Sequence, residues 1–72
     1  MPDKCIAIID SLIAVRKEKR ITQKDLAKAA NLSQPAIARF ESKSATPQLD
    51  TLLKVASALG CDIAVVPSNK NK

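Results

Sequence analysis

Two side chains of this sequence, Gln34 and Arg39, have the chemistry needed to recognise nucleic-acid bases. A glutamine amide can hydrogen-bond N6 and N7 of adenine together, and a guanidinium can do the same with O6 and N7 of guanine. Both side chains belong to residues 33–41, where apolar residues recur with helical spacing. The spacing predicts a helix that turns Gln34, Pro35, Ala36 and Arg39 outward, where Gln34 and Arg39 could reach base edges in a DNA major groove. The alternative is an ordinary exposed helix.

The ends of this helix and of the preceding one carry local signals. Thr22 is expected to cap the first helix, with Asp25 completing a capping box. Asn31 tolerates the left-handed conformation that closes a helix. Ser33 is expected to cap the second helix, and Pro35 stands in its first turn, where no N–H is needed.

Between these caps the apolar residues form one shared face. Leu26 and Ala27 lie on the first helix, and Ile37 and Phe40 face back from the second. Ala27 is small enough to sit where two steeply crossed helices approach most closely. Residues 22–41 are therefore predicted to form a helix-turn-helix.

The positive charge of the chain surrounds this motif. The 72 residues carry a formal net charge of +5, and eight Lys or Arg against three acidic residues lie between Arg16 and Lys43. Such a patch suits a polyanion, and Lys19 and Arg20 precede the motif at a corner from which phosphates are within reach. The alternative is a basic surface that is only solvated.

The sequence lacks the residues that several classes of function require. There is no His, and Cys5 and Cys61 lie at opposite ends of the chain, so we expect free thiols and no metal site. Gly60 is the only glycine, which excludes a glycine-rich phosphate loop, and Phe40 is the only aromatic residue, which removes a stacking platform for single strands. No segment has the length to cross a membrane or the pattern of a signal peptide. We expect no enzyme activity, no cofactor and no membrane partner.

A first helix is predicted over residues 3–19. Its apolar stripe ends in Arg16, whose spacing would bring it toward Glu41 in a partly buried ion pair. Two independent surface charges are the alternative. Ile6 and Val15 lie off the stripe, which indicates either a generously packed core helix or a contact surface for another subunit or protein. The stripe comprises Cys5, Ile8, Ile9, Leu12, Ile13 and Arg16.

Another helix is predicted after Thr46, which would be its N-cap, with Pro47 at its first position. Gly60 is expected to end it. Its predicted core stripe comprises Leu49, Leu52, Leu53, Ala56 and Leu59.

Residues 62–66 are rich in β-branched side chains and predict a short strand. A lone strand leaves its backbone groups unpaired, and the simplest partner is the same segment of a second copy, with Ile63 and Val65 at the dimer interface. The alternative is an extended segment lying on its own domain. Residues 1–67 are expected to form one domain, followed by a disordered basic tail at residues 68–72.

A specific combination of residues carries a resemblance to a known family: Arg16, Gln23, Leu26, Ala27, Leu32, Ser33, Gln34, Ile37, Glu41, Pro47, Leu59 and Gly60. Residues 12–60 resemble the helix-turn-helix domain of the Cro and phage-repressor family, also called Xre-type. The resemblance implies an all-α, compact four- to five-helix lambda-repressor-like DNA-binding domain, to which the residue pattern adds the short C-terminal β-strand. The usual turn glycine is replaced by Asn31, and residues 62–66 replace a fifth helix, as in small HipB-like and HigA-like antitoxins.

Carried over position by position, the resemblance implies two kinds of DNA contact and one structural pair. Gln34, Pro35 and Arg39 match positions that contact base edges. Arg16 and Glu41 match a buried ion pair. Gln23 and Ser33 match helix N-termini that contact phosphates, and Lys43 resembles a loop residue near the DNA backbone or the minor groove. Apart from the resemblance, phosphate contacts are also expected at the basic residues Lys19, Arg20 and Lys24.

The resemblance implies a sequence-specific transcriptional regulator of double-stranded DNA, with residues 33–41 in the major groove and a homodimer on a palindromic operator. We expect a cytoplasmic, nucleoid-associated protein of a prokaryote or phage. One alternative is an antitoxin that neutralises a toxin protein and autoregulates its operon. The other is a protein-interaction domain that has lost DNA binding, against which the basic segment and the intact Gln34 and Arg39 count.

Overall fold

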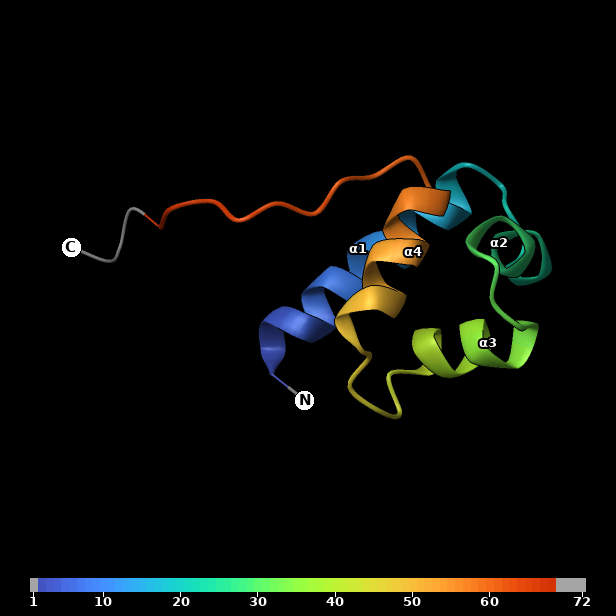
Figure 1. Cartoon of the computed structure of the whole chain (residues 1–72), viewed down its shortest axis with the longest axis horizontal. Coiled ribbons are helices and arrows are strands. Elements are labelled where there is room, and N and C mark those ends of the chain that lie inside the picture. Colours follow the sequence, from blue (N-terminus) through green and yellow to red (C-terminus); the bar gives the residue numbers. More distant parts are fainter. Residues whose placement is uncertain (1, 69–72) are drawn as a thin grey trace.

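Four helices form the regular secondary structure of residues 2–68, the part of the chain that this computed structural model describes. They are α1 (Asp3–Glu18), α2 (Gln23–Ala30), α3 (Gln34–Ser42) and α4 (Leu49–Ala58). Figure 1 shows α2 and α3 together on one side of the molecule, while residues 61–68 extend away on the opposite side. None of these helices is long and apolar enough to cross a membrane.

The predicted helix-turn-helix is confirmed, together with the expected roles of Thr22, Ser33 and Asn31 at its helix ends. Thr22 Oγ1 accepts a hydrogen bond from the backbone N–H of Asp25 at 3.0 Å, which is the Thr22 half of the capping box. Ser33 Oγ accepts from the N–H of Ala36 at 3.2 Å at the start of α3. Asn31 adopts the left-handed conformation with φ 59° and ends α2.

One core joins all four helices. The buried face shared by α2 and α3 is the predicted one, and Ala27 is only 4% exposed within it. The core comprises Ile9, Leu12, Leu26, Ala27, Ile37, Phe40, Val55, Ala56 and Leu59. Because α3 uses its inner face for this core, its outer face is left to solvent.

The prediction for α4 is wrong in its start and partly wrong in its buried face. The helix begins at Leu49, with Gln48 as its N-cap and no side-chain capping bond. Leu49 and Leu53 are 67% and 43% exposed, whereas Val55, which was not predicted in the core, is 1% exposed. Two overlapping stripes of this helix satisfy helical spacing, and packing against the other helices decides which one is buried.

The predicted strand at residues 62–66 is also wrong for the chain as described, because residues 61–68 form no regular secondary structure. A strand requires backbone partners on a neighbouring strand, and no other segment of residues 2–68 is a strand. The disorder predicted for residues 68–72 concerns positions that, apart from Ser68, lie outside the described residues.

Candidate nucleic-acid interface

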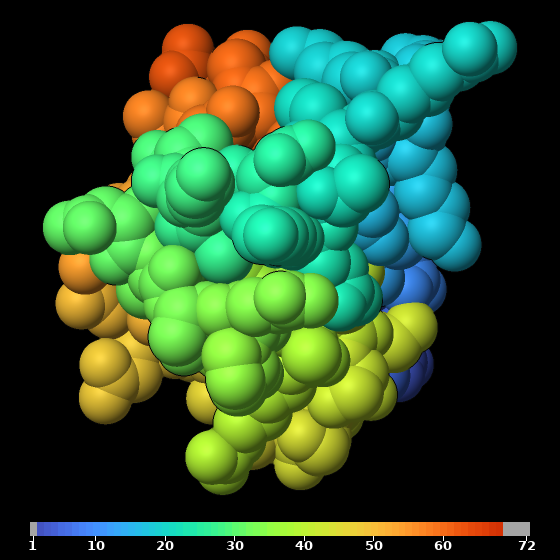
Figure 2. All heavy atoms as spheres, turned by 90° about the vertical axis from the view of Figure 1, so that its right-hand side faces the viewer, coloured from blue at the N-terminus to red at the C-terminus, as the bar shows by residue number. Residues whose placement is uncertain are grey.

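The outer face of α3 carries the residues predicted to contact bases. Gln34, Pro35 and Arg39 are all exposed, and Ser33 is exposed at the N-terminus of the helix. Figure 2 shows that α2 and α3, coloured teal to green, together occupy the middle of this face of the molecule. An open hollow of about 350 Å³ lies beside Arg39, between α3 and the loop at residues 45–48.

A partly buried polar network supports this face from behind. Arg16 on α1 donates from Nε to Glu41 Oε2 at 2.6 Å and from Nη2 to Glu41 Oε1 at 2.9 Å. The two side chains are only 12% and 8% exposed. Arg16 Nη1 also donates to the backbone oxygen of Ile21 at 2.8 Å. A bidentate pair with this burial fixes the C-terminal end of α3 against α1.

The same network orients a predicted phosphate contact. Gln23, the first residue of α2, donates from Nε2 to Glu41 Oε1 at 3.0 Å and is half-buried. A side-chain amide has two N–H donors, so one remains to face a phosphate. The N-terminus of α2 also presents backbone N–H groups that favour an anion. The buried carboxylate of Glu41 thus holds Gln23 at the N-terminal end of α2.

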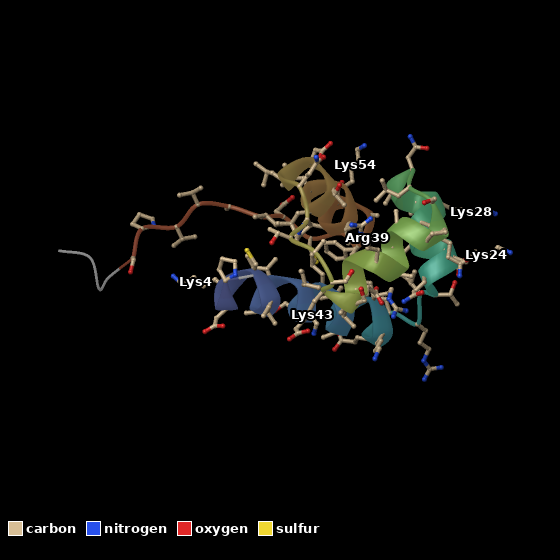
Figure 3. The ribbon with its side chains drawn as sticks, turned by 90° about the horizontal axis from the view of Figure 1, so that it is seen from below. Lys4, Lys24, Lys28, Arg39, Lys43 and Lys54 are labelled. Carbon is tan, nitrogen blue, oxygen red and sulfur yellow. The ribbon has the colours of Figure 1, made fainter. Side chains whose placement is uncertain are left out.

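The basic residues around the motif fall into two groups. Lys24 and Lys28 are exposed on α2 and point away from the body of the molecule in Figure 3. Lys28 was not assigned from the sequence, although its spacing from Lys24 places both on one helical face. By contrast, Lys19 and Lys43 each have a partner within the chain.

These two lysines bind groups on other elements. Lys19 Nζ donates to the backbone oxygen of Leu59 at 2.7 Å, at the C-terminal end of α4. Lys43 Nζ donates to Asp10 Oδ1 at 2.5 Å, joining the end of α3 to α1. Arg20, the remaining predicted cation, is exposed in the left-handed conformation with φ 59° directly after α1.

From the sequence we expect no metal site and two free cysteine thiols. Within residues 2–68, no group of three or more His, Cys, Asp or Glu side chains is placed to hold a metal ion. Cys5 and Cys61 are both free and half-buried. The arrangement can offer hydrogen-bond donors, a basic helix and two helix N-termini to an anionic ligand.

The chain is similar in sequence to transcriptional regulators and antitoxins that are already known. The family model described as Helix-turn-helix matches residues 12–66. An uncharacterized HTH-type transcriptional regulator of Haemophilus influenzae is 42% identical over 62 residues, which are 86% of this chain and 63% of that protein. Antitoxin HigA1 of Mycobacterium tuberculosis is 36% identical over 59 residues, or 82% of this chain and 40% of that one. The chain thus spans less than two thirds of the length of these curated relatives.

This chain also matches a solved structure, and it covers more of that protein's length than of the curated relatives. The chain is similar to a protein in a structure titled "Toxin-Antitoxin module from Streptococcus pneumoniae", with a TM-score of 0.75 and 51% identity. The match covers 90% of this chain and 71% of that one.

Proposed function

This chain belongs to the helix-turn-helix family, of the Cro and phage-repressor type, and on that premise we propose that it is a sequence-specific regulator that binds double-stranded DNA. The single observation that carries the proposal is the outer face of α3, on which Gln34, Pro35 and Arg39 are exposed while the opposite face is fully used by the core. Placed in a major groove, α3 offers one amide and one guanidinium to base edges.

Phosphates on either side of that groove would be held by the ends of the motif. Lys24 and Gln23 lie at the first turn of α2, and Ser33 begins α3. Lys43 lies at the other end of α3, so the two ends of the motif can contact the backbone on both sides of the groove. Lys43 is kept in this set because its pair with Asp10 is exposed and contributes little to stability, whereas Lys19 is left out because its ammonium group binds the backbone oxygen of Leu59 at the end of α4.

We include a homodimer in the proposal because the chain exposes apolar side chains on the segment after α4. Val65 and Val66 are 101% and 77% exposed, and Ile63 and Ile8 are 36% and 37% exposed. Burying these side chains against a second copy would remove apolar surface from water. The segment extends away from α2 and α3 (Figure 1), so such a dimer leaves the outer face of α3 accessible. Two copies of α3 could then bind successive half-sites of a palindrome in the cytoplasm of a prokaryotic host.

The alternative, an antitoxin that also regulates its own operon, is favoured by one observation. The similar solved structure is titled as a toxin-antitoxin module and is 51% identical over 90% of this chain. The α4 side chains Leu49 and Leu53 are exposed and would be available to a protein partner. If the alternative is right, a toxin gene adjoins this one, and co-expression of this chain relieves the growth arrest that the toxin causes.

Selection from a pool of random duplexes tests DNA binding directly. We expect enrichment of one palindromic sequence, which the protein then shifts on a gel while leaving a scrambled duplex of the same composition unshifted. A pool that remains unenriched, with no binding at low salt, would contradict the proposal and favour a protein-interaction domain.

A further inference from the structure

The contact between Lys43 and Asp10 joins the end of α3, the helix proposed to contact bases, to α1. Lys43 is the C-cap of α3, in the left-handed conformation with φ 59°. Its Nζ atom lies 2.5 Å from Oδ1 of Asp10, which is 33 positions away on α1. Figure 3 shows Lys43 where α3 meets α1. A negative charge therefore lies directly against a lysine proposed to contact a phosphate.

This pair differs from the buried pair beside it. The Lys43 and Asp10 side chains are 33% and 54% exposed, against 12% and 8% for Arg16 and Glu41. An exposed pair with a single hydrogen bond contributes little to stability and is screened by salt. The ion pair of Lys43 and Asp10 can therefore break with little loss of stability. The bidentate pair of Arg16 and Glu41 is also held by Gln23, and breaking it would leave a buried charge without its partner.

We propose that Asp10 sets the affinity and the salt dependence of DNA binding by competing with a phosphate for Lys43. The inference rests on the proposed DNA binding. In the free protein the carboxylate holds the ammonium group. On a duplex, Lys43 exchanges Asp10 for a phosphate, and the loss of the ion pair makes the net free energy of binding less favourable. Asp10 is thus a positioning residue that lowers affinity without touching DNA.

The experiment compares the full chain with the variant Asp10→Asn, which removes the charge and keeps the shape of the side chain. Affinity for a short random-sequence duplex is measured by fluorescence anisotropy over a series of salt concentrations. We expect Asp10→Asn to bind up to about five-fold more tightly at low salt, the equivalent of one exposed ion pair. The slope of log affinity against log salt should also steepen slightly, because salt screens the attraction between Lys43 and Asp10 and so removes the advantage of Asp10→Asn, while the number of phosphate contacts stays the same.

Asp3→Asn is the matched control, because it makes the same change of charge nearer the N-terminus of the same helix. Its effect should be smaller than that of Asp10→Asn, since it adds no free ammonium group. In a Lys43→Ala background, Asp10→Asn should have no larger effect than Asp3→Asn has. Thermal melting of each variant checks that the fold is unchanged, and Asp10→Ser provides a second substitution at the same position.

The outcomes separate this inference from the proposed function. If wild type and Asp10→Asn bind duplex with the same affinity and the same salt slope, the role of Asp10 is overturned while DNA binding stands. If Asp3→Asn and Asp10→Asn tighten binding equally, net charge explains both effects and the role of Asp10 is again overturned. If no variant binds duplex at any salt concentration, the proposed function fails and this inference fails with it.

Discussion

The ammonium group of Lys19 donates a hydrogen bond to the backbone oxygen of Leu59 across 2.7 Å, and so joins the end of α1 to the end of α4. The carbonyl groups in the last turn of a helix lack partners within the helix, and a positive charge there interacts favourably with the helix dipole. A β-carbon built on Gly60 would lie 3.2 Å from the same Nζ atom, so the ammonium is closely fitted to this corner. Lys19 therefore has a structural partner that its position beside the basic motif did not indicate.

Replacing Lys19 by Met should lower the free energy of unfolding by about 1 kcal/mol, because a charged hydrogen bond to a helix end is lost. In a domain of this size that corresponds to a fall of roughly 4–8 °C in Tm. The salt slope of DNA binding should stay as in wild type. Lys24→Met is the matched control and should behave in the opposite way, with unchanged Tm and a slope reduced by about 0.9. A reduced salt slope for Lys19→Met would show that Lys19 does contact a phosphate.

Replacing Gln34 or Arg39 by Ala should each cost about 1–3 kcal/mol of binding to the selected operator, because one bidentate base contact is lost. Both side chains are exposed, so the Tm should not change. Lys24→Ala serves as the control, weakening operator and scrambled duplex alike. An unchanged base preference after Arg39→Ala would mean that α3 is not the element that reads the sequence.

Replacing Glu41 by Ala should destabilise the fold by about 3 kcal/mol, because the Arg16 guanidinium loses its partner in a site where it is only 12% exposed. Gln23 loses an acceptor in the same variant. Thermal melting should show the double variant Arg16→Met, Glu41→Leu to be more stable than Glu41→Ala, since no buried charge is then left unpaired. Near-zero effects in both variants would show that the pair contributes nothing to stability.

Replacing Val65 by Asp should produce monomers and weaken operator binding, because a charge would be placed among side chains proposed to be buried between two copies. Sedimentation velocity measures the change. Leu49→Asp is the matched control: Leu49 is also exposed, at 67%, but lies at the start of α4, and its replacement should leave the dimer intact. If the dimer persists in Val65→Asp and dissociates in Leu49→Asp, the interface lies on α4 and not on the segment after it.

What the sequence by itself determined is the helix-turn-helix and its caps. Thr22 binds the N–H of Asp25, and Ser33 that of Ala36, each across three positions of the chain. Asn31 needs only its own backbone preference to close α2. Interactions this local depend on residue type and spacing, and residue type and spacing are visible in a sequence.

Only the tertiary structure decided which stripe of α4 is buried, how residues 61–68 are arranged and which groups hold the lysines. Leu49 and Val55 both fit a helical stripe, and the position of the neighbouring helices selects Val55. The partners of Lys19 and Lys43 lie 40 and 33 positions away and come into reach only when α1 has packed on the other helices. The physical reason is that such contacts depend on how helices cross, which the residues of any one helix do not specify.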